Sequence, residues 1–316
     1  MSIGSSLKEV LKRPSAIYKY LNSFGLLNGV SDETFAKLMW RAFTGRKLNL
    51  DNPKGFNEKL QWLKLYDRRE KYTMMVDKYL AREYVEKKVG GEHLVPLLGA
   101  WENPDDIDFD ALPEKFVLKC NHNSGEGMRL CKDKSKLDRA EAVSALKTAL
   151  SKDYSEKLRE WPYKNVKRRV IAEEFIIDHD PKNTLGTLID YKFYCFDGKP
   201  KFLYVGTDEI TGGKKGEARL SFLDLDWNPV PFGRTDHRPI AREIEKPDCL
   251  EEMKEIAEKL AEGMPFVRID LYYVNGKILF SEFTVFPGAG FGIFSPYEWE
   301  EKMGEWITLP AKKTVE

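Results

Sequence analysis

One segment near the C-terminus, "VRIDLYYVNGKILFSEFTVFPGAG" at residues 267–290, constrains the fold more than any other. Two apolar runs flank an Asn-Gly dipeptide, which is the strongest short-range signal for a β-hairpin. Charged residues nevertheless interrupt both runs, with Arg268 and Asp270 in the first and Glu282 in the second. The segment therefore predicts an antiparallel hairpin with charge inside its strands.

The turn decides whether these charges share a face, because side chains alternate between faces along a strand. A two-residue loop at Asn275-Gly276 would leave Asp270 and Glu282 on opposite faces. A three-residue loop with a bulge at Gly276 would bring Asp270, Glu282 and Thr284 to one face. We predict the second register, because it gathers the polar interruptions on one side.

Two carboxylates and a hydroxyl on one rigid surface suit a hard cation such as Mg²⁺, which prefers oxygen ligands and keeps waters or phosphate oxygens. The alternative is that Arg268 pairs with Asp270 or Glu282 on a solvated sheet face, as half-exposed antiparallel sheets often show. The hairpin by itself leaves both interpretations open.

The stretch "KFVLKCNHNSGEGMRL" is a second candidate. Lys119 ends a predicted strand, and the loop after it contains Ser124, Gly125 and Gly127. Glycines let backbone N–H groups approach a phosphate, and a nearby lysine adds a positive charge. The loop lacks the GxxxxGK[ST] pattern, and an ordinary hairpin turn is the alternative.

The stretch "VIAEEFI" is a third candidate, because an apolar strand here ends in Glu173 and Glu174. Such a strand end offers backbone groups to the edge of an adenine and a carboxylate to ribose hydroxyls. A solvated strand end is the alternative.

Composition narrows the class of protein. The 316 residues suggest two or three domains or lobes, and 42% hydrophobic residues are ample for a core. Lys plus Arg and Asp plus Glu are 51 each, so there is no overall basic field for nucleic acid. No apolar run approaches the roughly 20 residues of a spanning helix, and no signal-peptide core is visible at the N-terminus. We therefore expect a soluble cytoplasmic protein.

The order of elements predicts an α+β fold. Residues 1–75 read as helical, and later hairpins alternate with helices without a regular βαβ period, which favours antiparallel α+β lobes. The four cysteines and four histidines are scattered, so neither a zinc site nor a Ser-His-Asp triad can be recognised.

Taken in order, these pieces resemble the ATP-grasp superfamily. They are Lys78 in "VDKYLAREYV", Lys119 with "NSGEG", the "AEEFI" hinge, and "RID" followed by Glu282 and Thr284. A narrower resemblance covers nearly the whole chain: "FNEKLQWLKLYD", "DKYLAREYV", "REWPYKN", "DYKFYCFDGKP" and "SEFTVFPGAG" look like the TupA-like ATP-grasp family, named for teichuronopeptide biosynthesis. Its members are often associated with cell-surface polysaccharides.

The resemblance implies a fold of two lobes that clasp ATP. A helical region at residues 1–75 would precede a first lobe at residues 76–172 and a second lobe with the metal hairpin at residues 173–316. Lys78 and Lys119 would hold the α- and β-phosphates.

The resemblance also implies where the rest of the nucleotide binds. The loop from Ser124 to Gly127 would cover the phosphates. The backbone from Glu173 to Ile176 would receive adenine, and Glu174 or Asp190 would lie near the ribose.

The same resemblance also implies which residues would bind the metal and the γ-phosphate. Asp270 and Glu282 would bind one or two Mg²⁺ ions, with Arg268 stabilising the transferred phosphoryl group and Lys192 contacting the γ-phosphate. The sequence departs from the superfamily at Thr284, where most members have Asn, so Thr284 is the least secure metal ligand.

The implied activity is an ATP-dependent carboxylate–amine ligase that forms an amide through an acyl phosphate. Its substrates would be an amino acid and a uronic acid or similar carboxylate in polysaccharide biosynthesis, such as that of a capsule. It would have no nucleic-acid partner and no membrane span, with room for peripheral association with polysaccharide machinery. A nucleotide-sugar glycosyltransferase and a non-catalytic binding protein are the alternatives.

The acceptor site has one candidate, the stretch "REWPYKN". Arg159, Trp161, Tyr163 and Lys164 are residue types able to stack on a sugar and to grip a carboxylate. A connection packed by Trp and Tyr is the equally good structural explanation.

Overall fold

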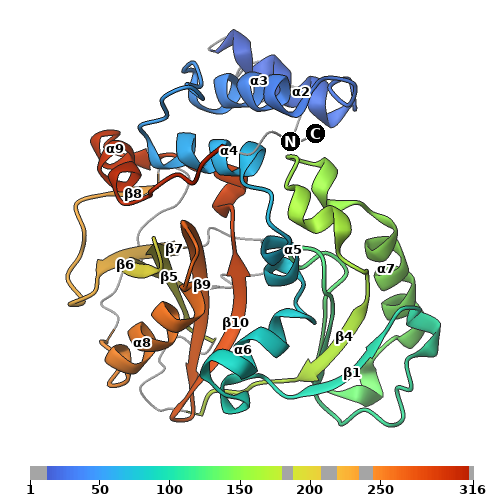
Figure 1. Ribbon diagram of the computed structural model, residues 1–316. Helices are drawn as coiled ribbons and strands as arrows, with labels where there is room; N and C mark the ends of the chain where they lie inside the picture. The colour runs from blue at the N-terminus through green and yellow to red at the C-terminus, as the bar shows by residue number, and fades with distance from the viewer. Residues whose placement is uncertain (1–12, 180–187, 208–218, 235–244, 313–316) are drawn as a thin grey trace.

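The computed structural model describes residues 13–179, 188–207, 219–234 and 245–312. Helices dominate the N-terminal part, and two larger antiparallel sheets with further helices follow it (Figure 1). The α-helices are α2 (Ile17–Ser23), α3 (Asp32–Thr44), α4 (Phe56–Tyr66), α5 (Glu70–Val76), α6 (Ala81–Val89), α7 (Arg139–Ser151), α8 (Leu250–Ala261) and α9 (Glu298–Glu305). The predicted α+β class is confirmed.

The strands in the described ranges form three sheets. They are β1 (Leu97–Trp101), β2 (Phe116–Cys120), β3 (Arg129–Cys131), β4 (Val170–Glu174), β5 (Asp190–Phe196), β6 (Lys199–Thr207), β7 (Arg219–Asp224), β8 (Gly233–Arg234), β9 (Phe266–Val274), β10 (Lys277–Thr284) and β11 (Phe294–Ser295). The first sheet has the order β1-β4-β2-β3, the second β10-β9-β5-β6-β7, and β8 pairs with β11. Every pairing between these described strands is antiparallel, and an isolated bridge between Leu94 and Phe280 is parallel.

The first sheet separates an apolar face from a polar one by simple alternation. On β2, Phe116, Leu118 and Cys120 are buried in a small core with residues of α7. Lys119 lies between them in sequence, so it points to the opposite face. In Figure 1, α6 lies between that face and the second sheet.

The second sheet buries one face against α8. Phe193 and Ile269, paired across β5 and β9, belong to the same buried core as Met253 and Ala257 of α8. The positions next to them in sequence, Lys192 and its partner Asp270, therefore point to the other face.

That other face changes from charged to aromatic along its length. At the aromatic end, Phe56 at the start of α4 packs edge-on against Phe266, with ring centroids 4.8 Å apart. Tyr194 and Phe294 lie near the same ring. The N-terminal helices thus share the larger core with the second sheet. The predicted division at residues 75 and 172 stays a prediction.

The β9–β10 hairpin has a different turn from the predicted one. Val274 pairs with Lys277, so the loop contains two residues, Asn275 and Gly276. Their φ angles are 52° and 77°. The predicted three-residue loop with a bulge at Gly276 is wrong, because Asn tolerates the left-handed conformation that a tight two-residue turn requires.

A bulge farther along β10 restores the common face. The register shifts between Phe280 and Glu282, which leaves Ser281 as the extra residue. Beyond it, Glu282 pairs with Asp270 directly across the hairpin. The two carboxylates therefore do share a face, through a bulge in the strand rather than at the turn.

None of the helices in the described ranges is long and apolar enough to cross a membrane.

Candidate functional site

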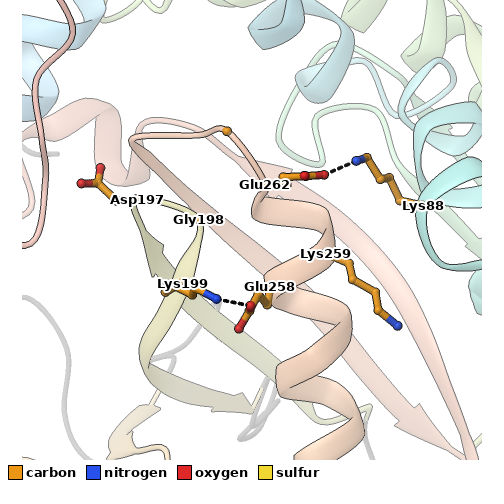
Figure 2. Close-up of a pocket in the computed structure, with 8 residues that line it drawn as sticks. Lys88, Asp197, Gly198, Lys199, Glu258, Lys259 and Glu262 are labelled. Carbon is orange, nitrogen blue, oxygen red and sulfur yellow. Dashed lines mark hydrogen bonds and ion pairs between the residues drawn. The ribbon is translucent and has the colours of Figure 1, made fainter.

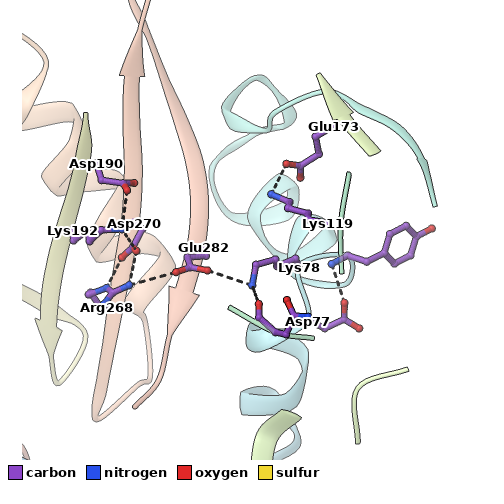
Figure 3. Close-up of polar contacts among 11 residues, drawn as sticks. Asp77, Lys78, Lys119, Glu173, Asp190, Lys192, Arg268, Asp270 and Glu282 are labelled. Carbon is purple, nitrogen blue, oxygen red and sulfur yellow. Dashed lines mark hydrogen bonds and ion pairs between the residues drawn. The ribbon is translucent and has the colours of Figure 1, made fainter. Parts of the chain in front are cut away.

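The charged end of the second sheet is centred on Asp270, whose side chain is fully buried. Arg268 donates to its Oδ1 from Nε and to its Oδ2 from Nη2, both at 2.6 Å, and Lys192 Nζ donates to Oδ2 at 2.7 Å. A buried carboxylate without partners would be strongly destabilising. The two cations therefore give the buried Asp270 carboxylate its partners and fix its orientation (Figure 3).

Glu282 connects this cluster to the first half of the chain. Its Oε1 lies 3.5 Å from Arg268 Nη2, and its Oε2 lies 3.3 Å from Lys78 Nζ. Burial by itself would raise the pKa of Glu282, but the charges of Lys78, Arg268 and Lys192 outweigh it and lower the pKa to about 2. Glu282 is thus held ionised by Lys78 from the turn before α6 and by Arg268 from β9 of the second sheet.

Asp190 is the third carboxylate on this face. Its Oδ2 lies 3.1 Å from Lys192 Nζ, and its Oδ1 is buried with no hydrogen-bond partner among the described residues. Burial raises the pKa of Asp190 to about 6, against the lowering effect of Lys192, and the nearby charge of Asp270 raises it further. A buried acceptor without a partner is a position where a ligand hydroxyl would gain a hydrogen bond.

Lys78 reaches Glu282 from the turn before α6. Asp77 holds that turn, because its Oδ1 accepts hydrogen bonds from the N–H of Tyr79 at 2.9 Å and from Asn121 Nδ2 at 2.8 Å. Lys78 Nζ also donates to the carbonyl of Asn123 at 2.8 Å. One ammonium group therefore joins the loop after β2 to the charged face of the second sheet.

Lys119 lies on the polar face of the first sheet with Glu173. Lys119 Nζ is 2.5 Å from Glu173 Oε2, and Arg82 Nη1 is 3.3 Å from Oε1. Glu174 is exposed, and its N–H donates to the carbonyl of Pro96 at 3.0 Å. This N–H is therefore already used, and the binding of adenine along Glu173 to Ile176 stays a prediction.

The predicted phosphate loop joins β2 to β3. Ser124 and Gly125 are exposed, and a Cβ built on Gly125 would meet nothing within 4 Å. Gly127 differs: its φ is +76°, and a Cβ there would lie 2.7 Å from the Cβ of Ala149 on α7. The loop is thus packed against α7 at one end and open at Gly125, where a ligand could approach the backbone.

The carboxylate oxygens on β9 and β10 fit a Mg²⁺ ion whose remaining ligands would come from phosphate. No group of three Asp, Glu, His or Cys side chains in the described ranges is arranged as a metal site. Asp270 and Glu282 face each other across the hairpin, however, and Mg²⁺ is commonly held by one or two carboxylates plus substrate phosphates. The contacts of Glu282, at 3.3 and 3.5 Å, are long enough to be exchanged for a metal.

Thr284 lies opposite Arg268, two residues beyond Glu282. Alternation therefore places it on the same face, and it is partly exposed. Its service as a metal ligand stays a prediction.

The sequence analysis did not predict several residues of the site. Arg82 is the second residue of α6, and its place in the "DKYLAREYV" motif with Lys78 could have indicated it. Tyr204 lies under Arg268, 5.7 Å from ring centroid to guanidinium carbon, because β6 pairs with β5. No local pattern in the sequence indicates that strand pairing.

Two residues of the "REWPYKN" stretch, Arg159 and Tyr163, have different surroundings. Arg159 points away from the site and donates to the carbonyls of Leu27 and Val30 at 2.8 and 2.7 Å, so it anchors the N-terminal helices. Tyr163, by contrast, packs edge-on against Tyr154 with ring centroids 4.8 Å apart, and burial raises its pKa.

A surface hollow of about 500 Å³ lies elsewhere, at the other end of β5 (Figure 2). It contains none of the predicted site residues. Four of its charged side chains already pair with one another, Lys88 with Glu262 and Lys199 with Glu258. The ion-pair chain of Figure 3 is therefore the better candidate for a reactive site.

Comparison with known proteins gives one family. A family model described as TupA-like ATPgrasp matches residues 58–308, more than half of the chain. No match was found among the curated proteins.

Several solved structures share a distant likeness. The ATP-grasp ligase PsnB, complexed with minimal precursor, Mg and ADP, is 16% identical with a TM-score of 0.39, over 72% of this chain and 57% of that one. D-alanine–D-alanine ligase from Bacillus anthracis, complexed with ATP, is 16% identical with a TM-score of 0.38, over 67% and 54%. The enzyme of the same name from Helicobacter pylori is 16% identical with a TM-score of 0.43, over 80% and 69%. The chain spans less than two thirds of the first two structures.

Proposed function

The chain belongs to the TupA-like ATP-grasp family and has the ATP-grasp fold, and from this premise we propose that it is an ATP-dependent carboxylate–amine ligase. The observation that carries the proposal is the continuous chain of ion pairs from Lys78 through Glu282, Arg268 and Asp270 to Lys192 (Figure 3). It gathers cations for phosphate and carboxylates for a divalent ion on one surface.

The nucleotide would lie between the two sheets. Lys78 and Lys119 would exchange their present partners, Glu282 and Glu173, for phosphate oxygens, since both ammonium groups are partly exposed. The open backbone at Gly125 would approach the phosphates. Asp190, with its unpartnered Oδ1, or Glu174 would accept a hydrogen bond from a ribose hydroxyl.

Asp270 and Glu282 would hold Mg²⁺, with Thr284 as an additional oxygen ligand. The ion, when bound, supplies positive charge that offsets the negative charge of the phosphates. Releasing carboxylate lone pairs for it requires Arg268 or Lys192 to turn toward the phosphoryl group, which is the position that catalysis would need.

The reaction would proceed in two steps. A substrate carboxylate oxygen attacks the γ-phosphorus, the bond to the β–γ bridging oxygen breaks, and ADP leaves. An amine then attacks the carbonyl carbon of the acyl phosphate, and phosphate leaves with the bonding electrons. Arg268 and Lys192 would stabilise the charge that develops in both steps, so no protein nucleophile is required.

The family's name suggests which carboxylate and which amine are the substrates. We infer that the carboxylate belongs to a uronic acid of a cell-surface polysaccharide or its precursor, and that the amine belongs to an amino acid.

A release assay tests this function. We expect purified protein with Mg·ATP to release ADP when a uronic acid such as glucuronate or galacturonate is present with an amino acid, and mass spectrometry to find the amide. Release of UDP from a nucleotide-sugar, with no ADP from any pair, would instead identify a glycosyltransferase.

A further inference from the structure

Asn121 is a fully buried residue directly after β2, two positions beyond Lys119. Its Nδ2 donates to Asp77 Oδ1 at 2.8 Å and to the carbonyl of Lys167 at 2.9 Å. Its Oδ1 accepts a hydrogen bond from the N–H of Arg169 at 2.7 Å. Both amide protons and the amide oxygen therefore have partners, and the side chain joins the turn before α6 to the start of β4.

The contact with Arg169 replaces a backbone contact of the first sheet. Cys120 pairs with Val170 at the end of the β2–β4 ladder, and the N–H of Asn121 continues the ladder by donating to the carbonyl of Arg169 at 3.0 Å. In an antiparallel pair of this kind, the N–H of Arg169 would ordinarily donate to the backbone carbonyl of Asn121. The side-chain Oδ1 accepts it instead, which leaves that carbonyl for another donor.

The other donor is Lys78. Its backbone N–H donates to the carbonyl of Asn121 at 3.1 Å, and its Nζ donates to the carbonyl of Asn123 at 2.8 Å. The same Nζ lies 3.3 Å from Glu282 Oε2 (Figure 3). The backbone and the ammonium group of Lys78 are thus both attached to the chain that follows Lys119.

The contact with Asp77 fixes the turn from which Lys78 projects. Its Oδ1 accepts the hydrogen bond from Asn121 Nδ2 and also those from the N–H groups of Tyr79 and Leu80, at 2.9 and 3.3 Å. These bonds hold the backbone on both sides of Lys78. Aspartate has no side-chain donor and serine has only one, so neither could make all the contacts of an asparagine here.

We propose that Asn121 is a positioning residue for ATP binding, which holds Lys78 at the distance from Lys119 that two ammonium groups need to bind one polyphosphate. Because Asn121 is fully buried, it acts on the nucleotide through Lys78 and does not touch it. This inference rests on the proposed ligase function and deepens it, because it adds a residue to the nucleotide site that no phosphate-binding motif contains.

A double-mutant cycle with Lys78 tests the proposal. We expect Asn121→Ser to raise the Kd for Mg·ATP about 10-fold, comparable to the loss of a residue that orients a metal ligand. In a Lys78→Met background, the same substitution should change the Kd less than about 2-fold, because the side chain that it positions is gone. Calorimetric titration with Mg·ATP measures the wild-type protein, both single variants and the double variant.

Asn57 provides a matched control. It is also fully buried, and its Nδ2 likewise makes two hydrogen bonds, to Glu300 Oε1 at 2.8 Å and to the carbonyl of Gly292 at 3.2 Å. Asn57→Ser should lower the free energy of unfolding and keep the wild-type Kd for Mg·ATP. Circular dichroism shows whether each variant is folded at the temperature of the titration. If Asn121→Ser is not, Asn121→Thr, which fills more of the space, takes its place in the cycle.

The cycle distinguishes failure of this inference from failure of the proposed function. An equal rise in Kd in the wild-type and Lys78→Met backgrounds would overturn the positioning role, since Asn121 would then act without Lys78. An unchanged Kd in a folded Asn121 variant would overturn it as well. Wild-type protein that binds no Mg·ATP would instead contradict the proposed ligase function itself.

Discussion

The buried carboxylate of Asp270 is shared by two cations, Arg268 on the same strand and Lys192 on the neighbouring strand. Three donors within 2.7 Å leave few lone pairs for a metal. Glu282, with its longer contacts, is the carboxylate more easily exchanged. In the proposed function, Glu282 would therefore exchange its partners for the metal first, and Asp270 would release lone pairs only when Arg268 or Lys192 turns toward the phosphoryl group.

Another buried carboxylate, Glu300 of α9, lies outside this site. It accepts hydrogen bonds from Phe294 N at 2.7 Å, Asn57 Nδ2 at 2.8 Å and Asn57 N at 3.1 Å. No cation is hydrogen-bonded to it among the described residues, and burial raises its pKa to about 7 from the ordinary 4.5, against the lowering effect of these donors. The folded state therefore holds the Glu300 proton more tightly than the unfolded state does.

The pH dependence of stability follows from this difference. Because the folded pKa is the higher one, the stabilisation is complete below pH 4.5 and is lost as the pH rises through about 7. Between pH 5 and pH 8 we expect Glu300 to lower the free energy of unfolding by about 2 kcal/mol. Urea denaturation at both pH values measures this change.

The Glu300→Gln variant should lose that pH-dependent part, whatever its stability at pH 5. Glu301 is exposed on the same helix, and Glu301→Gln should keep the wild-type slope. An unchanged slope in Glu300→Gln would show that other groups cause the pH dependence.

At the scale of elements, the β9–β10 hairpin shows how far the sequence can be interpreted. Alternation and Asn-Gly suffice to predict a hairpin with charges inside it. The turn prediction failed because Asn-Gly suits both loop lengths, and because the bulge at Ser281 has no local sequence signature. A bulge depends on how the strand fits its neighbour and the core, which is a property of the folded sheet.

The glycine loop offers a test at the same scale. Gly127→Ala would place a Cβ 2.7 Å from the Cβ of Ala149 and 3.2 Å from the carbonyl oxygen of Ala145, at a φ of +76°. We expect a loss of about 1–3 kcal/mol in the free energy of unfolding, because overpacking and backbone strain add. We also expect weaker ATP binding, since the loop must shift away from α7.

Gly125→Ala is the matched control, because its φ of +79° is similar and its Cβ would meet nothing within 4 Å. It should cost about 1 kcal/mol from backbone strain alone. Thermal unfolding and calorimetric titration with Mg·ATP measure both effects. Equal losses in the two variants would contradict the packing of the loop against α7.

At the scale of the whole molecule, the site exists because two sheets meet. Lys78 and Lys119 were recognisable in the sequence by resemblance, and so were Arg268, Asp270 and Glu282. Their pairing across the sheets, as in the contact of Lys78 with Glu282, depends on tertiary packing. Tyr163 was named in the sequence as part of the acceptor candidate "REWPYKN", but nothing in that stretch showed that Arg159 would instead anchor the N-terminal helices.

The central claim is that a carboxylate is activated as an acyl phosphate between these sheets. ATP labelled with ¹⁸O in its β–γ bridge tests this directly, because the label can move to a non-bridging β position only if ADP forms and rotates before the reaction reverses. We predict scrambling that requires the uronic acid, needs no amine and falls at least 100-fold in Asp270→Asn, comparable to the loss of an oxyanion donor. Amide formation by the wild-type protein without carboxylate-dependent scrambling would contradict the account.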